Sequence, residues 1–258
     1  MSWLAIRAAH TDRVSRYWER TVPSALSSSV VCLWSRSATE DDTAPFRVVP
    51  DGCTDLIWVP ATGQLLVAGP DTGHQLATAR PGRMVGIRFG PGVGPAVLAN
   101  PGHTLRDLRI PLNDLWPRDQ VDQLTEQLAL AAGPAEVDAV LVRAVAARLR
   151  QRPPDPAAPA IVAGVRRGEP ARAVADQLGL SERQLHRRCL AAFGYGPKTL
   201  HRVLRFHGAL DLARAGVPFA DVAATAGYAD QAHLSREVKA LSGISLGALV
   251  GSGTRSGG

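Results

Sequence analysis

The chain has 258 residues, 45% of them hydrophobic, which suffices for one large or two ordinary domains; no apolar run reaches the roughly 20 residues that a membrane helix needs. The formal net charge is +6, and the segment from Pro156 onward accounts for all of it, with 13 basic and 7 acidic residues. A basic half joined to a neutral half is typical of a nucleic-acid-binding domain carried by a domain with another task.

The first region, residues 1–116, contains short apolar segments separated by turn residues. The segments "VVCLWSR", "FRVVP", "DLIWVP", "QLLVAG" and "RMVGIRFGPG" follow one another at short intervals, with Pro and Gly mostly between them rather than within them. Pro50-Asp51-Gly52 is a strong reversal signal between two strands. This pattern predicts an antiparallel sandwich or a small cupin-like barrel, which would serve as an effector or dimerisation domain in an α+β protein.

Residues 117–159 change to a helical pattern and predict a connector. Two amphipathic helices follow each other, and they could pair with each other or with a second copy of the chain. Four prolines between Arg152 and Pro159 then predict a stiff linker at the domain boundary. The apolar positions of the two helices are Val121, Leu124 and Leu128, and then Val137, Leu141, Val145 and Leu149.

Residues 160–250 contain one unit twice, and residues 251–258 are expected to form a disordered tail. Val174 and Gly179 recur as Val222 and Gly227 at an offset of 48 residues. After a one-residue gap, Leu185, Arg187 and Gly194 recur as Leu234, Arg236 and Gly243 at an offset of 49. A short apolar helix, a glycine turn and a second helix with a basic face form a helix-turn-helix pattern, so the region is predicted to carry two such units.

The second helix of each unit is the candidate DNA-reading helix. A single amphipathic helix with arginine outside is usually only a solvated helix, but two copies in a basic region favour DNA recognition. A linking helix from Pro197 toward Gly216, about 27 Å long, is comparable with the ~34 Å between successive major-groove faces. The inward positions are Leu185, Cys189, Ala192 and Phe193 in the first helix and Leu234, Val238 and Leu241 in the second; the outward positions are Arg183, His186 and Arg187 in the first and Gln231, Ala232, Ser235, Arg236 and Lys239 in the second, with His233 near the rim.

This region resembles the AraC/XylS-type transcription regulators. The resemblance covers about 90 residues and is carried by "FGYGP", "LHRVLRFHGALDLA" and "VAATAGYADQAHLSREVKALSGIS". It departs from the family at Val238, where Phe is usual, and at Leu246, where Pro is common. The N-terminal half is similar to sensor domains that precede such regions, through "RVVPDGCTDLIW", "VAGPDTG" and "GIRFGPG". The resemblance implies DNA contacts by Arg183, His186, Arg187, Gln231, His233, Ser235 and Arg236.

Polar groups within the apolar strands are candidates for effector binding. Asp55 and Arg88 could orient a small ligand or could close a structural network, and His74 lies in a turn-rich segment. Trp58 is included as a ligand-stacking candidate, although Trp34 and Trp58 are more often core residues. Cys32, Cys53, His74 and His103 show no metal-ligand spacing, and with Cys189 the cysteines are expected to be reduced and mostly buried.

Together these patterns predict a cytoplasmic, sequence-specific DNA-binding transcription regulator. Its expected partners are double-stranded DNA, a small-molecule effector, RNA polymerase and a second copy of the chain; no membrane contact, metal or cofactor is expected. No phosphate loop, GxSxG or HExxH motif is present, so no enzyme activity is expected. The alternative is a β-barrel enzyme or small-molecule-binding protein whose helical tail mediates protein association.

Overall fold

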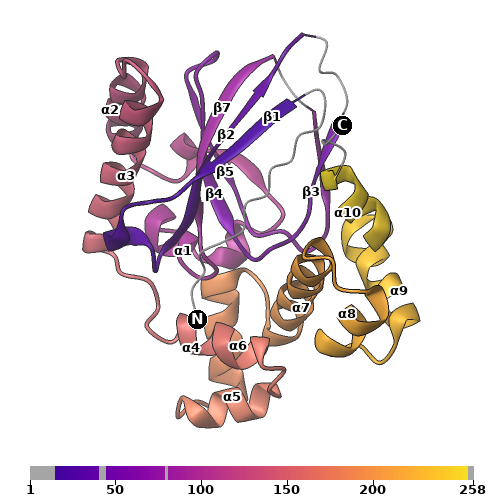
Figure 1. The fold of residues 1–258 in the computed structure, drawn as a ribbon. Coiled ribbons are helices and arrows are strands. Elements are labelled where there is room, and N and C mark those ends of the chain that lie inside the picture. The colour runs from indigo at the N-terminus through magenta and orange to yellow at the C-terminus, as the bar shows by residue number, and fades with distance from the viewer. Residues whose placement is uncertain (1–14, 41–44, 79–80, 255–258) are drawn as a thin grey trace.

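The structure is a computed structural model, and it describes residues 15–40, 45–78 and 81–254. The N-terminal domain is built on a six-stranded antiparallel sheet with the order β1-β2-β7-β4-β5-β8, and β3 pairs with β6 in a separate ribbon (Figure 1). The strands are β1 (Ser15–Arg20), β2 (Val30–Ala38), β3 (Pro45–Val48), β4 (Thr54–Val59), β5 (Gln64–Ala68), β6 (Gln75–Thr78), β7 (Gly82–Phe89) and β8 (Arg109–Pro111).

The predicted β domain is confirmed, but its sheet is open rather than a closed barrel. Within the described residues β1 and β8 each pair with one neighbour, so both edges of the six-stranded sheet are free of a strand partner. The barrel fails to close because β3 and β6 pair only with each other, whereas the two-layer sandwich alternative remains compatible with the fold.

The strand register places chemically different residues on the two faces of the sheet. Leu56 and Ile87 lie opposite each other on the apolar face, and Asp55 and Arg88 lie opposite each other on the second face. Alternation along each strand produces this separation. Trp34 lies across from Gly86, where a Cβ would collide with the indole, so only glycine fits beneath this tryptophan.

The first part of the chain also contains three α-helices: α1 (Gly94–Leu98) between β7 and β8, then α2 (Arg118–Ala129) and α3 (Pro134–Gln151) after β8. Helices α2 and α3 contact each other, and their apolar stripes share one core with the sheet residues Leu56 and Ile87. Asp138 on α3 accepts two hydrogen bonds from Arg20 on β1, at 2.6 and 2.8 Å. The apolar faces of α2 and α3 are therefore buried within the monomer. Short 3-10 turns lie at η1 (Ser24–Leu26), η2 (Gly102–Thr104) and η3 (Leu112–Asp114).

The C-terminal domain is helical throughout. Its helices are α4 (Ala158–Arg166), α5 (Ala171–Gln177), α6 (Glu182–Phe193), α7 (Pro197–Arg214), α8 (Phe219–Thr225), α9 (Gln231–Ser242) and α10 (Leu246–Thr254). Pro159 lies in the first turn of α4 rather than in the linker. In that turn the backbone amides have no partner within the helix, so the missing N–H of proline removes no helical hydrogen bond. Helix α10 extends into the stretch expected to be a tail, whose residues 255–258 lie outside the described residues. Among the described helices, none combines the length and apolar character required to cross a bilayer.

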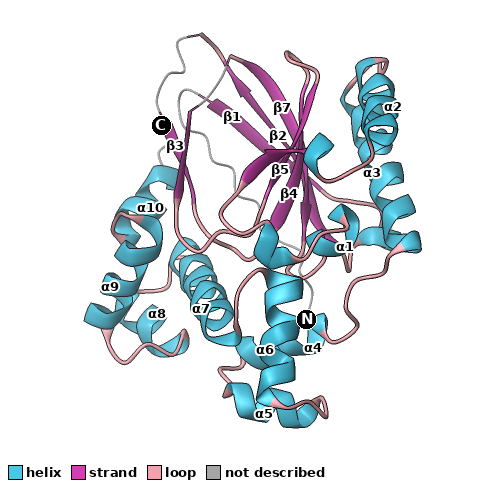
Figure 2. Cartoon of the chain, turned by 180° about the vertical axis from the view of Figure 1, so that it is seen from behind, coloured by secondary structure: helices cyan, strands magenta, loops and turns pink. Residues whose placement is uncertain are grey.

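The two domains touch through glycines at closely packed positions. A Cβ on Gly102 would lie 2.6 Å from the backbone nitrogen of Gly194, at the end of α6. On the second helix-turn-helix unit, a Cβ on Gly243 would lie 2.7 Å from the ring of His74. The N-terminal domain therefore contacts the ends of both candidate reading helices. In the two opposite views of the ribbon, most of the C-terminal helices lie below the sheet of the N-terminal domain (Figures 1 and 2).

Candidate nucleic-acid interface

The first helix-turn-helix unit consists of α5 and α6. Gly179 ends the first helix with φ +63°, a backbone conformation that residues with a Cβ rarely adopt. Ser181 caps α6: its Oγ accepts a hydrogen bond from the Gln184 amide at 3.2 Å, and the Gln184 side chain accepts one from the Ser181 amide at 2.8 Å. The apolar stripe predicted for α6 is buried: Leu185, Cys189, Ala192 and Phe193 are each at most 6% exposed.

The second unit, α8 and α9, repeats this architecture with different capping. Gly227 has φ +73°, and Asp230 caps α9 by accepting a hydrogen bond from the His233 amide at 2.6 Å. Gly194 and Gly243 end the two reading helices with φ +85° and +77°. The internal repeat seen in the sequence is thus a repeat of backbone conformation. The inward residues Leu234, Val238 and Leu241 are at most 1% exposed.

Helix α7 belongs to the cores of both units. Its first half supplies Leu200, Val203 and Leu204 to the core of the first unit, and its second half supplies Phe206 and Leu210 to the core of the second. All five side chains are buried. One continuous helix of 18 residues therefore sets the separation of the two units.

The outward faces of α6 and α9 are open to solvent in the intact chain. Every residue predicted to contact DNA is exposed except His233, which is half-buried. The predicted arginines make no ion pair or hydrogen bond with the described part of the chain, and they are not covered by the N-terminal domain. The exposed residues are Arg183, His186 and Arg187 on α6 and Gln231, Ser235 and Arg236 on α9.

Neighbouring arginines in the same domain have a different role. Arg188 donates a hydrogen bond to Asp155 in the linker at 2.8 Å. Glu237 on α9 accepts one from Arg202 on α7 at 2.8 Å and lies 3.9 Å from Arg205. The Glu237 cluster therefore fixes α9 against α7, whereas Arg188 holds α6 to the linker.

His233 lies at the rim, as predicted, and takes part in the turn. Its Nδ1 accepts a hydrogen bond from the Ala229 amide at 3.4 Å, and its ring meets Tyr228 edge-on with 5.3 Å between ring centroids. The guanidinium of Arg205 stacks on Tyr228, 4.2 Å from the centre of the ring. The imidazole thus stabilises the turn before α9.

Both departures from the family pattern are accommodated by burial. Val238 is 0% exposed in the core of the second unit, where the family usually has a larger side chain. Leu246 begins α10 and is 5% exposed in the same core. Neither residue lies on the reading face, so neither departure changes the residues offered to DNA.

In the N-terminal domain, Asp55 and Arg88 form the pair that the sequence suggested. Arg88 Nε donates to Asp55 Oδ1 at 3.1 Å, and Trp34 Nε1 donates to the same oxygen at 2.7 Å. Asp51 lies 3.8 Å from the Arg88 guanidinium. Burial raises the pKa of Asp55 and Arg88 opposes the rise; burial acts to lower the pKa of Arg88, but Asp55 and Asp51 outweigh it. Asp55 and Arg88 therefore have hydrogen-bond and ion-pair partners within the domain, which favours a structural role for them over ligand binding.

The other two effector candidates lie elsewhere. Trp58 is 2% exposed in the core under α2 and α3, on the sheet face opposite Asp55. It is a core residue because alternation along β4 separates the two positions. His74 lies in the loop before β6 and packs on Gly243 of the C-terminal domain. The structure therefore does not bring Asp55, Trp58 and His74 into one site.

The cysteines are packed as apolar residues. Burial raises the pKa of Cys32 and of Cys189 to about 12, and it also raises that of Cys53. Thiols protonated at neutral pH are poor nucleophiles and poor metal ligands. Within the described ranges no cluster of His, Cys, Asp and Glu could hold a metal ion.

Sequence reasoning missed a hollow on the sheet face opposite Asp55 and Arg88. Its lining residues come from three strands, β1, β2 and β7, so they are far apart in the sequence. The one available signal was the alternation in "YWER", which puts a tryptophan and an arginine on one face of an edge strand. The residues lining the hollow are Trp18, Glu19, Arg20, Ser35, Ser37 and Arg83.

Two protein families match separate parts of the chain. Residues 174–250 match the family described as a Helix-turn-helix domain, and residues 19–111 match a Domain of unknown function (DUF6597). No curated protein matches the chain. The helix-turn-helix match covers both of the units described above.

Solved structures of ToxT from Vibrio cholerae have a similar arrangement. The P21 form at 1.65 Å resolution has 10% sequence identity and a TM-score of 0.44, covering 81% of this chain and 97% of that one. The structure bound to (E)-4-(8-methylnaphthalen-1-yl)but-3-enoic acid has 10% identity and a TM-score of 0.46, covering 86% and 98%. At these values the likeness carries no functional conclusion.

The fold and the exposed faces define a DNA-binding regulator with an N-terminal β domain. Its C-terminal region is an AraC-type helix-turn-helix domain.

Proposed function

We propose that this chain binds double-stranded DNA with α6 and α9 in successive major grooves and regulates transcription under the control of a small molecule. The observation that carries the proposal is the exposure of both reading faces in the intact chain, with arginines that have no partner among the described residues. Helix α7, which joins the two units, is about 27 Å long, a length comparable with the ~34 Å of one turn of B-DNA.

The proposed DNA contacts divide by chemistry. Arg187 and Arg236 occupy equivalent positions of the repeat and would donate two hydrogen bonds to the edge of a guanine. Gln231 suits an adenine edge, and Ser235 can bond to either a base or a phosphate. Arg183 and His186 extend the face of α6, and His233 would act mainly by positioning the start of α9.

The N-terminal domain is proposed to sense the effector and transmit its presence. It touches the ends of both reading helices, at Gly194 and Gly243, so a change in its packing would alter their relative orientation. RNA polymerase is the proposed protein partner, the cytoplasm the proposed location, and no enzyme activity is proposed. A homodimer would need a surface other than the apolar stripes of α2 and α3, because these are buried against the sheet; sedimentation at working concentration tests it.

The test begins with selection of bound sequences from random DNA by the full chain, followed by titration of the selected site. Affinity should fall steeply as salt rises, because arginine–phosphate contacts release counterions. Arg187→Ala and Arg236→Ala should each weaken binding to the selected site by about 1–3 kcal/mol while the free energy of unfolding stays unchanged.

Arg118→Ala is the matched control, because Arg118 is 87% exposed on α2 in the N-terminal domain. It should bind DNA like the parent. If the two reading-face variants also bound like the parent, the assignment of these faces would be wrong. If the full chain showed no salt-dependent DNA binding, the alternative of a helical tail that mediates protein association would replace the regulator.

A further inference from the structure

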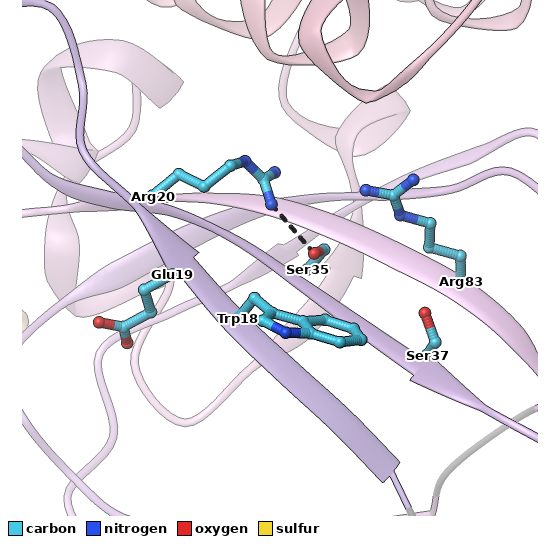
Figure 3. A pocket seen from close by; sticks show the side chains of 6 residues that line it. All are labelled: Trp18, Glu19, Arg20, Ser35, Ser37 and Arg83. Atoms are coloured by element: carbon cyan, nitrogen blue, oxygen red, sulfur yellow. Dashed lines mark hydrogen bonds between the residues drawn. The ribbon is translucent and has the colours of Figure 1, made fainter. Parts of the chain in front are cut away.

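A hollow of about 470 Å³, open to solvent, lies on the sheet face next to α3 (Figure 3). Three adjacent strands form it, with β2 in the middle and β1 and β7 on either side. This part of the sheet is the part that α2 and α3 leave uncovered. Its lining includes charged, hydroxyl and aromatic side chains rather than a purely apolar surface.

The charge inside the hollow is positive. The guanidinium groups of Arg20 and Arg83 point toward each other across β2 (Figure 3). Arg20 is held by Asp138 and donates from Nη1 to Ser35 Oγ at 3.1 Å. Arg83 has neither an ion pair nor a hydrogen bond with any described residue. Glu19 does not compensate it, because its side chain points away from the hollow and accepts a hydrogen bond from Tyr17 at 2.7 Å (Figure 3).

The remaining lining offers an aromatic surface and a hydroxyl. Trp18 is 47% exposed, one of the few large apolar side chains left open to solvent among the described residues. Trp18 pairs with Ser35 in the register of β1 and β2, and its ring points toward the side of Ser37 (Figure 3). The Ser37 hydroxyl, like the Arg83 guanidinium, makes no hydrogen bond within the described part of the chain. An indole face favours a planar group, and a free guanidinium favours a carboxylate or phosphate.

We propose that this hollow is the effector site and that it binds an organic anion, with its acidic group at Arg83 and its planar apolar body on Trp18. Arg20 is paired with Asp138, so Arg83 carries the unpaired positive charge of the site, and Ser37 donates a hydrogen bond to the acidic group. The inference rests on the proposed function, since it names the ligand class and the site of that small-molecule control.

Trp18 and Arg20 project from one face of β1, and Glu19 projects from the other. A ligand in the hollow would act on the DNA-binding domain through the contacts that the N-terminal domain makes at Gly194 and Gly243.

The experiment titrates the full chain by calorimetry with 2-naphthoate, 2-naphthyl phosphate and the neutral 2-naphthamide. At least one anion should bind with a stoichiometry of one, at least about tenfold more tightly than the amide, because the amide lacks the charge that Arg83 recognises. The ratio of the two anions decides between a carboxylate and a phosphate ligand. Arg83→Gln should weaken anion binding at least about tenfold, and Arg118→Gln should leave it unchanged.

Trp18→Ala provides a second variant, which should weaken both anions and the amide through loss of the aromatic surface. No saturable binding of either anion, or binding that Arg83→Gln and Trp18→Ala leave unchanged, overturns the site. DNA titrations separate this result from the regulator proposal: 2-naphthoate or the phosphate should change the DNA affinity of the parent but not of Arg83→Gln. Ligand binding without that change overturns the effector role, whereas absence of any DNA binding overturns the regulator and leaves the binding site standing.

Discussion

Most of the paired arginines in the N-terminal domain bind carboxylates of the fold, whereas the arginines on the outward faces of α6 and α9 do not. In the N-terminal domain they hold the fold: Arg20 binds Asp138, Arg88 binds Asp55, and Arg109 binds Asp71 at 2.6 Å. On the outward faces of α6 and α9, Arg187 and Arg236 have no partner among the described residues. A guanidinium kept on a rigid helix without a partner is available to an external anion, so the comparison separates structural arginines from those offered to DNA. Arg83 of the N-terminal domain also has no ion pair or hydrogen bond with a described residue, and it lies in the proposed effector site.

The largest expected effect is the loss of DNA binding when the two reading-face arginines, Arg187 and Arg236, are removed together. Because they lie on different helices without shared partners, their losses should add, so Arg187→Ala with Arg236→Ala should weaken specific DNA binding by about 2–6 kcal/mol. Titration of the selected site with both single variants and the double variant measures this. A double variant no weaker than the worse single variant would show that the two helices do not bind DNA independently.

The structural side of the comparison is tested at Arg88. Arg88→Leu leaves Asp55 and Asp51 without their cation in a largely buried position, and the free energy of unfolding should fall by about 3–5 kcal/mol. Urea unfolding of this variant and of Arg118→Leu, whose arginine is 87% exposed, provides the measurement and its control. An unchanged midpoint for Arg88→Leu would mean that the network contributes nothing to folding and would reopen a ligand-binding role for Asp55.

Glu237 tests the arginines that fix α9 on α7. Glu237→Gln removes the carboxylate that faces Arg202 and Arg205, and we expect a loss of about 1–2 kcal/mol in unfolding free energy because the cluster is only partly buried. Amide exchange should show the loss within α8 and α9 rather than in α6. Equal exchange in both units would indicate that the apolar core alone holds α9.

The smallest effect is expected at Arg188, next to Arg187 in the sequence. Its side chain is 41% exposed and pairs with Asp155, so Arg188→Ala should cost at most about 1 kcal/mol of stability. Base-specific binding should remain close to that of the parent, in contrast to Arg187→Ala. A loss of DNA affinity equal to that of Arg187→Ala would show that basic charge, rather than the orientation of the side chain, determines binding.

Much of the C-terminal domain was predictable because its signals are local. Period-3.6 apolar positions predicted which residues of α6 and α9 are buried, and glycines at the turns predicted where helices end. The β domain was predicted as a class, but strand pairing joins distant segments, so the open sheet and the β3–β6 ribbon could not be read from the sequence. Trp58 was placed among the ligand candidates because residue type alone does not say which face of a strand is buried.

The sequence by itself determined the repeat, its turns and the outward residues of each reading helix, because these depend on the spacing of side chains along a single helix. Tertiary structure decided the rest. It made α7 common to both cores, and it paired Arg188 with Asp155 while Arg187 has no partner among the described residues. It also brought Trp18, Ser37 and Arg83 from three strands into one hollow. The physical reason is that pairing and burial depend on what packs opposite a side chain, and that partner is distant in the chain.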